Sequence, residues 1–133
     1  MIIYSKKKIV VCFILLFLLI LNDKPNVYVE KFIQGLAHHN YFLYLKFIGI
    51  RSNIKLIKSE TERNIKISKD DVEILFDHEC VLLHELAHLA IFLDNKDRIY
   101  ERERVIDDYY LKIIKFSSED LYNKCKNYRT DKK

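Results

Sequence analysis

The sequence contains few of the residues that interrupt regular structure. Among its 133 residues there are only two glycines and one proline. Because glycine and proline mark turns and the ends of elements, their scarcity predicts helices and strands joined by short turns, and it argues against flexible linkers. Half of the residues are hydrophobic, so the chain is not intrinsically disordered. Its length fits one domain rather than two.

The chain also lacks a strong excess of one charge. Its net charge is +4, and many of its lysines and arginines have acidic neighbours in the sequence. Aromatic residues do not alternate with basic ones, as they do on surfaces that bind single-stranded nucleic acid. We therefore expect no nucleic-acid partner.

Small residues are missing after the N-terminal hydrophobic run. Three lysines, Lys6 to Lys8, precede the run Ile9–Leu21, and the next alanine, glycine or serine is Gly35. A basic stretch before an apolar run is the pattern of an export signal, whose removal requires small residues at the cleavage site. The pattern favours an uncleaved signal-anchor. A cleaved signal of a secreted protein and a buried hydrophobic helix are the alternatives.

The chain accordingly divides into an N-terminal signal segment, residues 1–25, and a domain, residues 26–133. Because lysines beside a membrane segment stay on the cytoplasmic side, we expect a single-pass membrane protein whose domain lies outside the cytoplasm. Cys12 belongs to the apolar run, and Cys80 and Cys125 have no recognised spacing. We interpret these two as small core residues, although an oxidising compartment would allow them to pair.

The domain is expected to begin with helical structure. Apolar periodicity predicts a helix from Val27 to His39, with His38 and His39 at its C-terminus, where a histidine interacts favourably with the helix dipole. The next segment, Tyr41–Ile50, is rich in aromatic and β-branched residues and fits either a strand or a buried helix.

Two short runs that follow, Ile54–Lys58 and Asn64–Ser68, alternate partly between polar and apolar residues, which predicts a β-hairpin. Ser68 and Asp71 resemble an N-terminal helix cap. The long apolar segment Val72–Leu93 is therefore predicted to be one helix that is buried nearly all round. Residues 123–133 are polar, and we expect a solvated tail there.

The chemistry of the chain is suggested by the stretch VLLHELAHLA, which runs from Val81 to Ala90. On a helix, His84 and His88 lie one turn apart on the same face and can bind one Zn²⁺ ion together. Glu85 lies about 100° further round, where its carboxylate can take a proton from a water on the metal. A buried helix would exclude these polar groups unless a metal or another partner satisfied them. A helix with its histidines on a solvated edge is the plainer alternative.

A catalytic zinc site needs a third protein ligand and an open position for water. Asp94 has the spacing of a metzincin ligand, but no glycine breaks the helix before it. Helical periodicity from Arg98 onwards places Glu103 within an apolar stripe and Asp107 at its border, which favours Glu103 as the ligand. The stripe consists of Ile99, Ile106, Tyr110, Ile113 and Ile114, and the other acidic candidates are Asp97, Glu101 and Asp108.

The motif HELAH followed by Glu103-Arg-Val-Ile-Asp107 resembles the HExxH and ExxxD pattern of gluzincins, the thermolysin-like zinc metallopeptidases. The helix around Glu103 also resembles that of the compact ImmA/IrrE-like peptidases. The resemblance implies Glu103 as the third zinc ligand, Asp107 as the hydrogen-bond partner of His84 or His88, and Glu85 as general base. A weaker resemblance, to WLM and SprT-type DNA-repair peptidases, rests on LLHELAHL, and their third histidine has no counterpart here.

The fold implied is α+β, with the metal-binding helix beside a small sheet whose edge strand holds a protein or peptide substrate in extended form. The predicted hairpin is the expected source of that strand. Four residues are candidates for stabilising the oxyanion, namely Tyr109, Tyr110, His38 and His39.

Two other functions fit the same residues. The chain could be a catalytically inactive, membrane-associated interaction protein that binds zinc on a zincin scaffold. Alternatively, Cys80 lies one turn before His84 and could complete a closed structural zinc site, but such a site would give no reason for Glu85.

Overall fold

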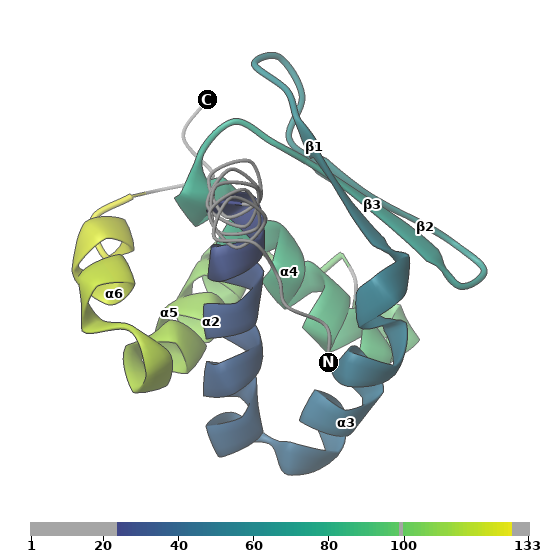
Figure 1. Cartoon of the computed structure of the whole chain (residues 1–133), viewed down its shortest axis with the longest axis horizontal. Coiled ribbons are helices and arrows are strands. Elements are labelled where there is room, and N and C mark those ends of the chain that lie inside the picture. Colours follow the sequence, from purple (N-terminus) through teal and green to yellow (C-terminus); the bar gives the residue numbers. More distant parts are fainter. Residues whose placement is uncertain (1–23, 99, 129–133) are drawn as a thin grey trace, which may run out of the picture.

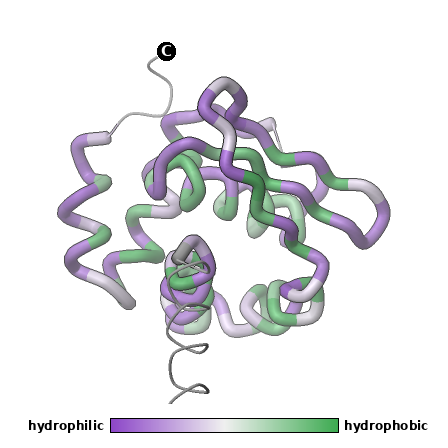
Figure 2. Tube along the Cα trace, turned by 45° about the horizontal axis from the view of Figure 1, so that its top comes forward, coloured by the Kyte–Doolittle hydropathy of each residue, from purple (hydrophilic) through white to green (hydrophobic). Residues whose placement is uncertain are grey.

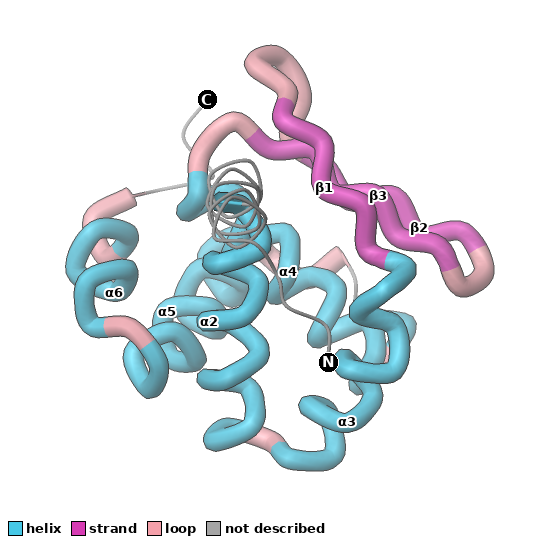
Figure 3. The backbone as a smooth tube through the Cα atoms, viewed as in Figure 1, coloured by secondary structure: helices cyan, strands magenta, loops and turns pink. Residues whose placement is uncertain are grey.

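A computed structural model of the chain describes residues 24–98 and 100–128 (Figure 1). Over these residues the fold is α+β, with five α-helices and one three-stranded sheet, which confirms the expected fold class. The sheet lies along one side of the helices (Figure 3). The predicted signal segment up to residue 23, including Cys12, lies outside the described residues. None of the described helices is long and apolar enough to cross a bilayer.

The first two helices follow each other almost directly and pack together. Helix α2, Lys24–His39, begins close to the predicted position and buries Val29, Phe32 and Leu36 against the core. Helix α3, Tyr41–Ile50, follows after one residue, because the Asn40 side chain accepts a hydrogen bond from the backbone of Leu43 at 3.1 Å and caps the new helix. Of the two alternatives, a strand and a buried helix, the segment therefore forms a helix. Only one side of this helix is buried.

The three strands differ from the predicted hairpin. After the short 3-10 turn Arg51–Asn53, strands β1, Ile54–Lys58, and β2, Asn64–Ser68, have the predicted bounds. They do not pair with each other, because β3, Asp71–Phe76, lies between them in the order β1-β3-β2. Strand β3 is parallel to β1 and antiparallel to β2. The predicted hairpin is therefore wrong.

The predicted long helix is also wrong in its first part. Val72 and Ile74 are buried and Glu73 between them is less so, which is the alternation of a strand. Hydrophilic and hydrophobic residues alternate along the strands (Figure 2). Ser68 caps no helix but pairs with Asp71 beside the β2–β3 turn, where Lys69 adopts a left-handed conformation with φ of 50°.

Helix α4, Glu79–Asp94, is capped by His78, whose Nδ1 accepts a hydrogen bond from the backbone of Cys80 at 3.1 Å. Every residue from Cys80 to Ile91 is buried, as predicted for a helix surrounded by protein. The sheet covers one side of this helix and helices α2, α3 and α5 contact it from others. Helix α4 is therefore the centre of the core.

The C-terminal part consists of a short 3-10 turn, Lys96–Arg98, and of helices α5, Glu103–Ser117, and α6, Glu119–Cys125. The described part of the predicted apolar stripe is buried in α5, namely Ile106, Tyr110, Ile113 and Ile114, whereas Ile99 is outside the described residues. The sequence predicts a solvated tail from residue 123. This expectation is wrong for residues 123–125, because they belong to α6, which is bonded to α4.

A disulfide between Cys80 and Cys125 links α4 to α6. Both residues are buried, as interpreted from the sequence, but they form a covalent bond rather than simple packing contacts. Because Cys80 is bonded to sulfur and not free to ligate a metal, the structural zinc site with Cys80 is excluded.

Candidate metal centre

Helix α4 presents both histidines of the HELAH motif on one buried face. The rings of His84 and His88 have their centroids 4.8 Å apart and are inclined by 76°. Both side chains are buried, so the alternative of a solvated helix edge is wrong. The spacing of four residues brings the two rings together because they are separated by slightly more than one helical turn.

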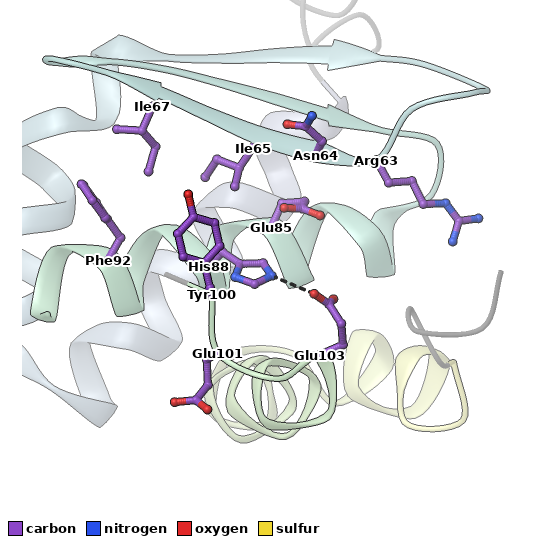
Figure 4. A pocket seen from close by; sticks show the side chains of 10 residues that line it. All are labelled: Arg63, Asn64, Ile65, Ile67, Glu85, His88, Phe92, Tyr100, Glu101 and Glu103. Atoms are coloured by element: carbon purple, nitrogen blue, oxygen red, sulfur yellow. Dashed lines mark ion pairs between the residues drawn. The ribbon is translucent and has the colours of Figure 1, made fainter. Parts of the chain in front are cut away.

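Glu103 comes to the same place from a different helix. It is the first residue of α5, and its carboxylate contacts Nε2 of His84 and lies 3.6 Å from Nε2 of His88. Figure 4 shows it pointing from the start of α5 toward His88. One ligand atom from each of the three residues lies within 4.8 Å of the other two.

The three donors fit a metal ion by their chemistry and spacing. Two imidazole nitrogens and a carboxylate oxygen form one of the ligand sets of catalytic zinc. Two ligands of a tetrahedral zinc, each about 2.1 Å from the ion, lie about 3.4 Å apart. The separation of 3.6 Å between His88 Nε2 and Glu103 Oε1 is close to that value. These residues form a group that could hold a metal.

Helical periodicity does not explain why Glu103 belongs to this group. The apolar stripe predicts a buried side chain, but the side chain of Glu103 is 50% exposed. It stands at the N-terminus of α5, where the helix dipole favours a carboxylate. Glu103 therefore forms the solvent-facing side of the group, while the histidines form its buried side.

Asp107 supports the group from within α5. Its Oδ1 lies 2.8 Å from Nδ1 of His84, and both side chains are buried. When Nδ1 carries the proton and donates a hydrogen bond to Asp107, Nε2 of His84 keeps its lone pair on the side of Glu103. Of the two histidines left open by the sequence, His84 is thus the one that contacts Asp107.

Burial and charge act on the acidity of the neighbouring groups. Burial lowers the pKa of His84, but the hydrogen bond with Asp107 and the negative charges of Glu103 and Glu85 outweigh it, so that the net pKa is raised. Burial raises the pKa of Glu85 to about 7, against the opposing effect of His84. A carboxyl group with such a pKa exchanges protons near neutral pH.

Glu85, His88 and Glu103 open into one pocket of about 570 Å³. Ile65 and Ile67 of strand β2 form the wall opposite helix α4 (Figure 4). The remaining lining residues are Arg63, Asn64, Phe92, Tyr100 and Glu101. The pocket is large enough for part of a peptide or a small ligand.

Sequence reasoning missed several of these lining residues. Arg63 lies in the loop before β2 and pairs with Asp77 at 2.9 Å, and Phe92 follows His88 by one helical turn on α4. Helical spacing from His88 could have indicated Phe92. Arg63 and Tyr100 stand in loops, where no periodicity marks the direction of a side chain.

Other residues predicted as candidates lie elsewhere. Asp94, Asp97 and Asp108 are exposed and belong to no metal-binding group of the described residues. Glu101 lines the pocket but forms an ion pair with Arg98 at 3.3 Å.

None of the four predicted oxyanion-stabilising residues lines the pocket. His38 stacks on Phe116, and His39 meets the ring of Tyr109 edge-on. Burial raises the pKa of Tyr109 to about 12. Tyr110 is buried in the core with its ring 6.4 Å from that of His84. These positions give no support to an oxyanion role for any of the four residues.

Comparison of the chain with the sequence models of known protein families, with curated proteins and with solved structures found no match.

Proposed function

We propose that this chain is a zinc-dependent metallopeptidase of the gluzincin type. The observation that carries the proposal is the convergence of His84, His88 and Glu103 beside a pocket that Glu85, His88 and Glu103 line. A site built only to bind metal for stability is usually closed by four protein ligands. Here three donors meet beside an open pocket, which leaves room for water and substrate.

The ligands proposed for Zn²⁺ are Nε2 of His84, Nε2 of His88 and the carboxylate of Glu103. A bound zinc ion lowers the pKa of water and polarises a carbonyl group. When Asp107 accepts a hydrogen bond from Nδ1, the ring of His84 is held in one orientation, with the lone pair of Nε2 able to bind the metal.

Glu85 is proposed as the general base. It shares α4 with both histidines and faces the same pocket, and its buried carboxyl group has a pKa of about 7. In this role the carboxylate takes the proton of the attacking water and then donates it to the leaving amine. Glu103 is proposed as a metal ligand and not as the base, because its carboxylate contacts both histidines.

Strand β2 is proposed to hold the substrate. It pairs only with β3 among the described strands, so its other edge can accept an extended peptide as a further strand. Ile65 and Ile67 of this strand line the pocket together with Glu85, which supports binding of such a peptide next to the proposed base. The substrate class is therefore an extended segment of protein or peptide.

The proposed location is the extracytoplasmic side of a membrane. The disulfide between Cys80 and Cys125 supports it, because stable disulfides form outside the reducing cytoplasm. The basic and apolar pattern of residues 6–21 supports it independently.

Replacement of Glu85 by glutamine tests the enzymatic role. The full-length protein, loaded with zinc, is incubated with a random peptide mixture, and new N-termini are identified by mass spectrometry. Glu85→Gln should retain zinc and lose at least about 100-fold in rate, because the general base is removed. The control Glu62→Gln, in the exposed loop between β1 and β2, should cleave like the wild type.

The same experiment distinguishes the inactive alternative. A wild-type protein that holds zinc in the group of His84, His88 and Glu103 but cleaves no peptide of the mixture is an interaction protein on this scaffold, and the peptidase proposal fails. Equal rates for Glu85→Gln and the wild type would remove Glu85 from the mechanism.

A further inference from the structure

Helix α3 has an apolar face that no described element covers. Four residues at helical spacing form it and are exposed, namely Tyr41 at 61%, Phe42 at 79%, Leu45 at 48% and Ile48 at 44%. The opposite side of the helix buries Leu43 and Phe47 in the core. We call the four exposed residues the α3 face. Large hydrophobic residues grouped in this way mark a surface that contacts something other than water.

The charges around the α3 face restrict what can cover it. Helix α3 contains no acidic residue, and its one charged residue, Lys46, is exposed beside Phe42 and Leu45 in the helix. Lysine is depleted from the centres of protein interfaces, where its charge needs an acidic partner. A second copy of the face would bring no acidic residue of α3, and the run Ile9–Leu21 contains none either. A lipid surface would bring phosphates, whose negative charge complements Lys46.

The position of α3 relative to the start of the domain points the same way. Arg51, directly after α3, contacts Asn26 at 2.9 Å and Glu30 at 3.0 Å. The end of α3 is thereby held beside the first turns of α2, where the chain enters from residues 1–23. The apolar run Ile9–Leu21 precedes this point by only a few residues. A bilayer that received the run would lie next to the end of α3.

We propose that the α3 face lies on a lipid bilayer, at the boundary between headgroups and acyl chains. Phe42, Leu45 and Ile48 enter the apolar side of this boundary, the ring of Tyr41 lies at headgroup level, and Lys46 contacts lipid phosphate. Helix α3 then runs along the membrane rather than across it. This contact is independent of the metallopeptidase proposal and does not require zinc.

A tryptophan reporter tests the contact, because the natural chain contains no tryptophan. Phe42→Trp is made in the full-length protein and reconstituted into vesicles of equal parts phosphatidylcholine and phosphatidylglycerol. The control is Asn123→Trp, an exposed position on α6. Figure 1 shows α6 and α3 on different sides of the molecule. Circular dichroism compares the fold of each variant with the wild type, and Leu45→Trp provides a second reporter on the same face.

The same vesicles are then prepared with lipids brominated on their acyl chains. The variants Phe42→Trp and Leu45→Trp should emit at shorter wavelength than Asn123→Trp and lose about half of their fluorescence, because interfacial helices enter the bilayer by about 5–10 Å. The fluorescence of the control variant should change little. Short-wavelength emission from Phe42→Trp without quenching would overturn the proposal, since protein would then cover the face. Emission from that variant at the wavelength of a water-exposed indole would overturn it as well.

Discussion

Oδ1 of Asp107 lies 2.8 Å from Nδ1 of His84, and both side chains are buried between helices α4 and α5. This contact joins the helix that carries HELAH to the helix that carries Glu103. It fixes the orientation of a ring whose other nitrogen faces the proposed metal. The two helices are thus connected at the site itself and not only through the core.

Replacement of Asp107 by asparagine should therefore weaken zinc binding. The amide keeps the shape of the side chain but loses its negative charge, and loss of such a partner typically lowers metal affinity by about 10–100-fold. Competition with a chromogenic chelator measures the affinity. The control is Asp108→Asn, the exposed neighbour on α5. Equal zinc affinities for the two variants would show that the Asp107 contact does not support the site.

Removal of the disulfide should destabilise the whole domain. The bond between Cys80 and Cys125 closes a loop with a sequence separation of 45. The loss of loop entropy in the unfolded chain stabilises the fold by about 4 kcal/mol for a loop of this size. The double variant Cys80→Ala/Cys125→Ala should lose about this much free energy of unfolding in urea. A change near zero would show that packing of α6 on α4 suffices without the bond.

Gly35 should not tolerate a side chain. A Cβ at this position would overlap the backbone carbonyl of Ile113, because α2 and α5 cross closely there. Overpacking costs about 1–3 kcal/mol, and a clash with backbone atoms belongs to the upper part of this range, above the gain of about 1 kcal/mol from replacing glycine in a helix. Gly35→Ala should lower the unfolding temperature. Gly49→Ala is the matched control and should be neutral or stabilising, because a Cβ at Gly49 has no atom within 4 Å.

Glu79 should contribute to stability above its pKa and not below it. Burial raises the pKa of Glu79, but the hydrogen bond from Lys124 and further favourable interactions outweigh it, so the net pKa is lowered. A carboxylate with a lowered pKa in the folded state stabilises the fold above its unfolded pKa of about 4.3, and the effect is lost as the pH falls through the folded pKa.

A comparison of wild type and Glu79→Gln by urea unfolding between neutral and acidic pH measures this effect. The wild type should be the more stable at neutral pH, and the difference should shrink as the medium becomes acidic. The effect should be small, because the partner Lys124 is largely exposed. A difference that stays constant with pH would assign it to packing rather than to charge.

The grouping of the candidate site residues could be predicted from the sequence more fully than the fold around them. His84, Glu85 and His88 share one helix, so the helical repeat alone determines their relative positions. Glu103 and Asp107 come from a second helix, and their placement beside His84 depends on how α5 packs on α4. The resemblance to gluzincins implies that placement. Helical periodicity also selects Glu103, but it does so by predicting a buried side chain, and the side chain is half-exposed.

The pairing of the strands is beyond local reasoning. The patterns of Ile54–Lys58 and Asn64–Ser68 predict strands with the observed bounds. Both strands, however, pair with β3, and β3 is parallel to β1 although β2 lies between them in the sequence. The residues of β3 are mostly apolar and run almost directly into α4, so the pattern assigns them to that helix. A short apolar run fits a buried strand and a buried helix equally well.

The central claim is that His84, His88 and Glu103 bind one zinc ion, and the zinc content of purified full-length protein tests it most directly. The protein is prepared without chelators, its fold is checked by circular dichroism, and zinc is measured by mass spectrometry of the metal. The account predicts one zinc per chain, lost in His84→Ala/His88→Ala and kept in His38→Ala/His39→Ala, a pair of histidines outside the site. A folded wild-type protein that neither contains zinc nor takes it up when zinc is supplied would contradict the account.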